Sequence, residues 1–204
     1  PEAIAAAEYY ANLIREFGPD GGVTYTADQV TQALKLGRTN FTDAGQIYLA
    51  QLGDPAASKT VKTANFGLVP KGPAGRFPGV AVHGLGIPAG SKNKEAAWAF
   101  IQWALSKQVT RRAVAAGYGA PARRSDIDSK EFRARQMING HDLAELSLQS
   151  IDIAARSGHM KYRTVAVYPQ VDQQLNTAIA RIATKQLSAR QAMQQAQAAS
   201  IVEV

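Results

Sequence analysis

The stretch HGLGIPAGSKNKEAAWAF contains the spacing Gly84-x-Gly86-x-x-Ala89, which outlines a dinucleotide-binding loop. Such a loop holds a pyrophosphate on free backbone N–H groups at the start of the following helix. Pro88 removes one of those donors, and the stretch about 20 residues further on, ALSKQVTRR, has no acid to bind the ribose. The glycines are therefore expected to let the backbone pass close to another segment or a ligand.

The other residue types that bind metals or catalyse reactions do not form a recognisable site in this sequence. The three histidines, His83, His141 and His159, do not have metal-ligand spacing, and there is no cysteine. No nucleophile elbow, phosphate-binding loop or catalytic carboxylate pair is present. We therefore expect no enzyme, no metal and no cofactor. His83, at the end of a predicted strand, either faces a cleft or is a structural or solvated residue, and Asp43 in TDAG suits a turn or helix cap.

Composition indicates a folded domain with a basic surface. Of 204 residues, 46% are hydrophobic and 19% charged, and the formal net charge is +7. A basic balance can indicate an anionic partner, but the basic residues are scattered rather than gathered in a block. No apolar run is long enough to span a bilayer. The chain opens on PEAIAAAEYYANLIREF without an initiator Met, so we interpret it as an internal fragment or a processed chain.

Most of the elements that would position these residues are predicted to be helices. Apolar spacing predicts helices over residues 3–17 and 131–157 and over segments beginning at Thr26, Ser91 and Ser188. A further amphipathic helix follows YPQV, and GQIYLAQL is also helical. Capping boxes are predicted at two of these starts, in Thr26–Gln29 and Ser188–Gln191.

Short strands are predicted between the helices, in TNFTDAG, NFGLVP and VAVHGLGIP. Strands separated by helices indicate a helix-rich α/β fold with a parallel or mixed sheet. In the helix after Ser91, Trp98 shares one apolar arc with Phe100, Ile101 and Leu105, so it is predicted to be a core residue. Trp103 falls off that arc and is expected to face a neighbouring segment or solvent.

Four strings in order carry a resemblance to a known family: FGLVPKGPAGR, GLGIPAGSKNKEAAWAFIQWALSK, GYGAPARRS and YPQVDQQLNTAIARIATKQLSARQAMQQA. Together they resemble the C-terminal half of extracellular solute-binding proteins of bacterial ABC importers, of the carbohydrate type that includes maltose-binding protein. The resemblance covers about residues 1–200.

The resemblance implies a periplasmic-binding-protein-like (type II) fold of two lobes, with a ligand cleft between them and hinge-crossing segments. Residues 1–85 and 126–204 would belong to the C-terminal lobe, and residues 86–125 would cross the hinge into the N-terminal lobe. Family members are about twice this length, so most of the N-terminal lobe is expected to be missing. A cleft with half its wall absent would bind ligand weakly or not at all, and the uncovered surface would favour self-association.

The resemblance also implies a function and a set of site residues. The protein would be the periplasmic or extracellular, membrane-associated substrate-binding component of an ABC importer, binding a sugar or polyol and docking on permease membrane subunits, with no nucleic acid. In the family an aromatic residue commonly follows the turn at DAG, a position that Ile47 occupies here. Two alternatives stay open, a basic helical module for nucleic acid and an uncharacterised α/β enzyme. The candidate ligand-binding residues are Asp43, Gly45, Gln46, Ile47, His83, Gly84 and Arg123.

Overall fold

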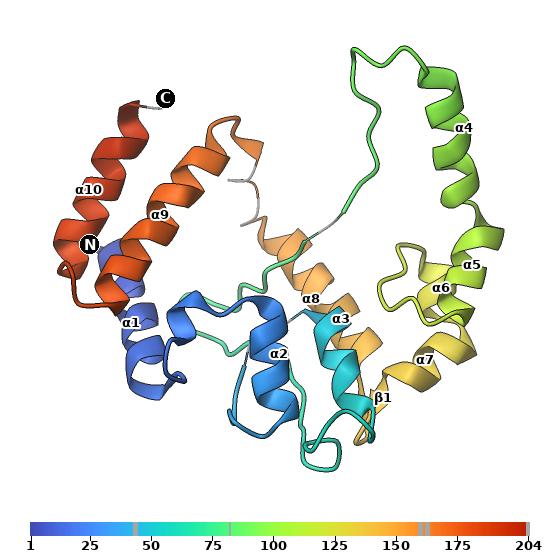
Figure 1. Cartoon of the computed structure of the whole chain (residues 1–204), viewed down its shortest axis with the longest axis horizontal. Helices are drawn as coiled ribbons and strands as arrows, with labels where there is room; N and C mark the ends of the chain where they lie inside the picture. The colour runs from blue at the N-terminus through green and yellow to red at the C-terminus, as the bar shows by residue number, and fades with distance from the viewer. Residues whose placement is uncertain (43–44, 82, 159–160, 162–163, 203–204) are drawn as a thin grey trace. The chain divides into compact units, whose positions relative to one another are not determined.

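In a computed structural model, the chain forms two compact units. The first unit comprises Pro1–Thr42 and Gly158–Val204, and the second comprises Asp43–Ser157. The structure describes residues 1–42, 45–81, 83–158, 161 and 164–202, without the side chains of residues 46, 47, 50 and 202. Helices dominate both units (Figure 1). The helix-rich character predicted from the sequence is therefore confirmed.

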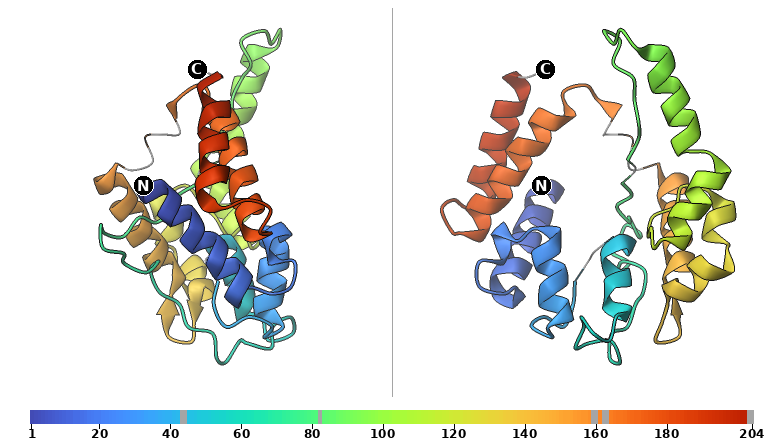
Figure 2. Two further views of the ribbon diagram at one scale, coloured as in Figure 1. Left: turned by 90° about the vertical axis from the view of Figure 1, so that its left-hand side faces the viewer. Right: turned by 45° about the vertical axis from the view of Figure 1, so that its right-hand side comes forward.

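The first unit is helical, and its core is built largely from alanine. It comprises α1 (Glu2–Phe17), the short 3₁₀ helix η1 (Gly22–Thr24), α2 (Ala27–Lys35), α9 (Tyr168–Ala183) and α10 (Ala189–Val202). The views in Figure 2 show α9 and α10 side by side, and α1 contacts both. Helical spacing places one stripe each of α1, α9 and α10 in the core because residues three or four apart share a face. The buried residues are Ala7, Ala11, Ala178, Ile182, Ala189, Ala192 and Ala196.

Both predicted capping boxes are present in this unit. The Thr26 backbone N–H donates to Gln29 Oε1 at 2.7 Å, and the Gln29 N–H donates to Thr26 Oγ1 at 3.4 Å. Ser188 and Gln191 make the same reciprocal pair at the start of α10. At the other end of α2, Gly37 adopts φ +68°, and its N–H donates to the Leu34 carbonyl. Glycine fits this left-handed position, which closes the helix.

The second unit contains α3 (Gln46–Leu49), the 3₁₀ helix η2 (Ala50–Gly53), α4 (Lys94–Ala104), α5 (Lys107–Ala115), α6 (Arg124–Ile127), α7 (Lys130–Gln136) and α8 (Leu143–Ser157). Its core is centred on Phe132 of α7, which is 1% exposed and packs with Val114, Ala144 and Ile127. These three neighbours come from α5, α8 and α6, so one aromatic ring joins four helices.

The predicted long helix over residues 131–157 is wrong because a hairpin divides it. Strands β1 (Met137–Ile138) and β2 (His141–Asp142) pair antiparallel between α7 and α8. The two turn residues, Asn139 at φ +50° and Gly140 at φ +79°, both have left-handed backbone. An Asn-Gly pair is the usual sequence for such a two-residue turn.

The three predicted strands do not form among the described residues, where β1 and β2 are the only strands; residues 43, 44 and 82 of the predicted strands lie outside the described part. NFGLVP and VAVHGLGIP have no strand partner in the described part of the unit. Side chains instead attach the first of these segments to the hairpin: Asn139 Nδ2 donates to the Ala64 carbonyl at 2.8 Å, and a 3.1 Å hydrogen bond joins His141 Nε2 to Asn65 Oδ1. The expected sheet is therefore not formed by these segments.

Two predictions about α4 are also wrong. Ser91 is not its N-cap: Ser91 Oγ accepts the Asn93 N–H in a local turn, and the helix begins at Lys94. Trp98 is not a core residue, because its side chain is 55% exposed and no residue of α4 is buried. Trp103, at 60% exposed, faces solvent, which was one of the two expectations.

Candidate functional site

Three of the seven candidate residues, Gly45, Gln46 and Ile47, lie at or near the start of α3. Asp43 lies outside the described residues, and the structure describes only the backbone of Gln46 and Ile47. Gly45 precedes the helix, and its carbonyl accepts the N–H groups of Tyr48 and Leu49 at 2.9 and 3.2 Å. A Cβ added at Gly45 would lie 3.8 Å from the Tyr48 ring, an ordinary contact. Gly45 therefore forms the first turn of α3.

His83 and Gly84 lie on an exposed extended segment of the second unit. A Cβ added at Gly84 or Gly86 would meet nothing within 4 Å, and neither glycine has a left-handed φ. The described chain itself therefore requires no glycine at either position. The close approach expected from the sequence is not made to any described segment, so a ligand or a partner stays the prediction for these glycines.

Arg123 links two helices of the second unit. It is the N-cap of α6, and its guanidinium donates a short hydrogen bond to the backbone carbonyl of Leu105. Leu105 is the C-cap of α4, so a positive charge lies at the negative end of that helix. Arg123 is nevertheless exposed overall. The side chain is thus available at the surface while it is oriented by α4.

The candidate residues are not joined to one another by interactions. No hydrogen bond or ion pair of the described chain links Gly45, His83 and Arg123. The Arg123 guanidinium is oriented by the Leu105 carbonyl, which is not a candidate residue. Whether the seven positions line one cleft stays a prediction.

An arginine–carboxylate cluster is the main electrostatic feature that the sequence analysis missed. Arg133 of α7 contacts Asp142 at 2.6 Å, Asp128 at 2.8 Å and Glu145 at 3.6 Å. Its hydrogen bond lowers the pKa of the Asp128 carboxyl, and Asp128 in turn raises the pKa of Arg133. The spacing Arg124–Asp128 is a sequence signal for one branch of the cluster. The cluster joins α6, α7, β2 and α8, so its role is structural.

Asp126 of α6 is a second feature without a sequence signal. Its side chain is 0% exposed, and neither carboxylate oxygen has a hydrogen-bond partner among the described residues. A buried carboxyl without a partner costs stability. Ser129 contacts the Asp126 backbone carbonyl, not the carboxyl group.

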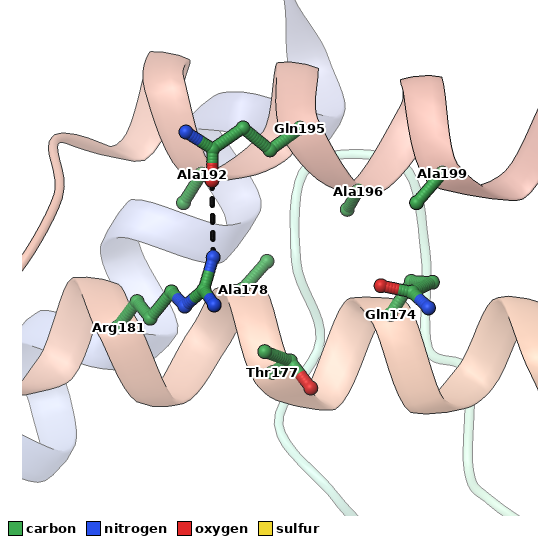
Figure 3. Close-up of a pocket in the computed structure, with 8 residues that line it drawn as sticks. All are labelled: Gln174, Thr177, Ala178, Arg181, Ala192, Gln195, Ala196 and Ala199. Carbon is green, nitrogen blue, oxygen red and sulfur yellow. Dashed lines mark hydrogen bonds between the residues drawn. The ribbon is translucent and has the colours of Figure 1, made fainter.

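Two hollows of the described surface lie in the first unit. One of about 150 Å³ lies between α9 and α10, where Arg181 donates to Gln195 at 3.0 Å (Figure 3). Another of about 340 Å³ lies beside α2 and includes Asp28 and Arg38. Neither contains a candidate residue. The described residues contain no group of three potential metal ligands, and none of their helices is long and apolar enough to cross a membrane.

Comparison with known proteins identifies the family. The model of the family described as bacterial extracellular solute-binding protein matches residues 1–111, which is more than half of the chain. The chain belongs to this family.

The fold agrees with this solute-binding family. The structure matches that of an ABC transporter solute-binding protein from Agrobacterium radiobacter K84, solved in complex with ribitol, with a TM-score of 0.84 and 23% sequence identity. The match covers 98% of this chain and 49% of that chain, so the chain spans about half the length of its solved relative. The periplasmic-binding-protein-like fold expected from the sequence is confirmed. No curated protein matches the sequence.

Proposed function

We propose that this chain is part of the substrate-binding component of a bacterial ABC importer, which captures a sugar or polyol between two lobes and delivers it to a membrane permease. The observation that carries the proposal is the shared fold with an ABC transporter solute-binding protein that holds ribitol. The family match over residues 1–111 supports it independently. A periplasmic or extracellular location follows from the same family.

The candidate residues have the chemistry that a polyol requires. Each hydroxyl of a polyol both donates and accepts a hydrogen bond, so its site needs donors and acceptors. Arg123 supplies N–H donors and Asp43 a carboxylate acceptor, while Gln46 and His83 can do either. Gly45 and Gly84 leave backbone groups accessible because they carry no side chain.

The residue at position 47 favours an open-chain polyol over a ring sugar. Aromatic rings commonly stack on the apolar face of a pyranose, but this position carries isoleucine. An acyclic polyol has no such flat face and gains less from stacking. A polyol is therefore the ligand class that we propose first.

The proposed mechanism has no covalent step. Ligand bound between two lobes makes contacts in the closed state that are absent in the open state, and this difference shifts the population toward closure. The permease would recognise and bind the closed state. In this scheme residues 86–125 cross the hinge, and residues 1–85 and 126–204 form the C-terminal lobe. Binding and release alone transfer the solute, so the proposal requires no catalytic residue.

The test uses calorimetry on two proteins. The chain by itself spans half of its relative, so we expect weak or undetectable binding of ribitol, other polyols and glucose. Submicromolar affinity of the isolated chain would contradict this expectation. In a fusion that supplies the remaining half of the ribitol-binding relative, we expect saturable polyol binding. Salt-sensitive binding to a DNA duplex without solute binding would instead favour the nucleic-acid module.

Adjacent arginines provide the matched variants. In the fusion, Arg123→Ala should weaken polyol binding by about 10- to 100-fold, because a hydrogen bond from a charged donor contributes about 1.5–3 kcal/mol to the binding free energy. Arg124→Ala is the control, since Arg124 is paired with Asp128 at 2.6 Å and is not a candidate residue. Equal affinities of the two variants, at matched thermal stability, would remove Arg123 from the proposed site.

A further inference from the structure

The turn between β1 and β2 carries a sequence that can react with itself in water. The chain has six asparagines, and Asn139 is the one that is followed directly by glycine. A backbone nitrogen can attack the side-chain amide carbon of the asparagine that precedes it, and glycine permits this because it has no Cβ to obstruct the approach. The pair Asn139–Gly140 is therefore the position in this chain at which deamidation is chemically easiest.

Water and the attacking nitrogen both have access to this turn. Asn139 and Gly140 are exposed, and a Cβ added at Gly140 would meet nothing within 4 Å. The Gly140 N–H donates no hydrogen bond within the described part of the chain. Neither the attack nor the hydrolysis that follows it is therefore obstructed at the turn itself.

The side-chain amide, in contrast, is held by a neighbouring segment of the second unit. Asn139 Nδ2 donates to the Ala64 carbonyl at 2.8 Å. A hydrogen bond of 3.1 Å joins His141 Nε2 to Asn65 Oδ1, and the His141 ring lies edge-on to Phe66, with ring centroids 5.9 Å apart. Three successive residues of that segment therefore contact the hairpin, at the turn and just after it.

The conformation of the turn opposes the reaction as well. Asn139 and Gly140 have φ of +50° and +79°, as in a two-residue turn of type I′. In this turn the nitrogen of the second residue points away from the side chain of the first, so the attack needs a backbone rotation at Asn139. That rotation takes the amide away from the Ala64 carbonyl. Reaction in the folded chain therefore requires the hairpin to separate locally from residues 64–66.

We propose that Asn139 is a deamidation site whose rate is set by the contact between the hairpin and residues 64–66. Once the turn opens, the Gly140 nitrogen forms a bond to Asn139 Cγ and the bond from Cγ to Nδ2 breaks. The proton of the Gly140 N–H leaves with the amide nitrogen as ammonia. Water then adds to the cyclic imide and breaks one of its C–N bonds, which leaves aspartate or isoaspartate at this position. Overall, water is consumed and ammonia is released.

The modification would in turn release the segment that slows it. A carboxylate at position 139 has no N–H to donate, so its oxygen atoms would face the Ala64 carbonyl as acceptor against acceptor. Isoaspartate also adds a carbon atom to the main chain of a two-residue turn, which disturbs the pairing of Ile138 with His141. Deamidation therefore loosens residues 64–66 from the hairpin irreversibly, whichever solute the protein binds.

Peptide mapping by mass spectrometry tests the proposal on the intact chain. During incubation at mildly alkaline pH, the peptide that contains Asn139 should gain mass before the peptides of the other five asparagines do. The same incubation in urea should speed conversion by about tenfold or more, because the hairpin no longer has to open. The pair Asp20–Gly21 can form the same imide, but its isomerisation leaves the mass unchanged, so the gain in mass reports deamidation alone.

Variants separate the effect of residues 64–66 from that of the turn. Asn65→Ala removes the partner of His141 and should speed conversion in the folded chain by about two- to tenfold, which is the effect of one hydrogen bond on the open population. His141→Ala should have the same effect from the hairpin side, and neither variant should change the rate in urea. Asn176→Ala is the matched control, because it removes a hydrogen bond to Asp172 on α9 and should change neither rate. Circular dichroism checks that all three variants are folded.

The effect of the product is measured separately. Asn139→Asp reproduces one of the two products without the reaction. Amide exchange at Ala64, whose N–H donates to the Thr60 carbonyl at 2.8 Å, should then speed up by about two- to tenfold. Unchanged exchange would overturn the release of residues 64–66.

Three further results would overturn the proposal. The first is an equal rate of conversion at Asn139 in the folded chain and in urea. The second is another asparagine that converts before Asn139. The third is a folded-state rate that neither Asn65→Ala nor His141→Ala changes. None of these measurements involves solute, so failure here is distinct from failure of the proposed function.

Discussion

Truncation of Phe132 to alanine should be among the most damaging single changes in the second unit. The ring is 1% exposed and contacts Val114, Ile127 and Ala144, one from each of three neighbouring helices. Replacing a phenylalanine buried in this way by alanine lowers the free energy of unfolding by about 3–5 kcal/mol. The upper half of that range is expected, because Ala144 has only a methyl group and cannot fill the cavity.

The assay is urea unfolding followed by far-ultraviolet circular dichroism. With a slope of about 2 kcal/mol/M, a loss of about 4 kcal/mol lowers the unfolding midpoint of this unit by about 2 M. Because Phe132 lies in the core of the second unit, the transition of the first unit should keep its midpoint.

The matched control is Phe100→Ala. Phe100 also lies on a helix but is 57% exposed, so the free energy of unfolding should change by no more than about 0.5 kcal/mol. The reasoning would be refuted if Phe132→Ala cost less than about 1 kcal/mol, or if both variants lost the same amount.

Three further predictions concern polar groups. Asp126→Leu should stabilise the second unit in thermal unfolding, because an apolar side chain of similar size removes two buried oxygen atoms that have no hydrogen-bond partner among the described residues; a lower melting temperature would contradict this. Thr26→Ala should destabilise the first unit by about 1 kcal/mol through loss of its capping box, whereas Thr26→Ser should not, as urea unfolding would show. The pKa of Asp128 is lowered by Arg133, so its stabilisation is full above the unfolded pKa near 3.9 and is lost as pH falls through the lower folded pKa. Asp128→Asn should therefore reduce the loss of unfolding free energy as the pH falls, measured by urea unfolding at several pH values. An unchanged pH dependence would mean that the Asp128–Arg133 pair does not contribute to stability.

Local signals allowed correct prediction of several helix boundaries. Thr26 with Gln29 and Ser188 with Gln191 were identified because a capping box involves residues only three apart. The stop at Gly37 was equally local. The break between α7 and α8 had a local signal as well, the Asn139–Gly140 pair, but the apolar spacing on either side was continuous enough to be interpreted as one helix.

The strands could not be predicted in the same way. Alternating apolar residues in NFGLVP and VAVHGLGIP predict strands, but the described residues of these segments have no strand pairing. A strand also needs a hydrogen-bonded neighbour, which local sequence does not encode. The long-range contacts of the candidate site residues could not be predicted from local sequence either. The sequence selected Arg123 as a candidate, but it gave no indication that its guanidinium reaches the Leu105 carbonyl, 18 residues earlier.

The error at Trp98 carries information about the protein. Periodicity predicted a helix with a buried apolar arc, and the helix forms, but the arc is exposed. Periodicity indicates which face of a helix avoids water and does not indicate what covers it. The same holds for residues 79–81 and 83–87, which have the apolar pattern of a strand but pair with no strand of the described chain. Both mismatches fall within one continuous stretch, residues 79–105. Two kinds of incompleteness, one in side-chain burial and one in backbone pairing, therefore coincide in one stretch of the described chain.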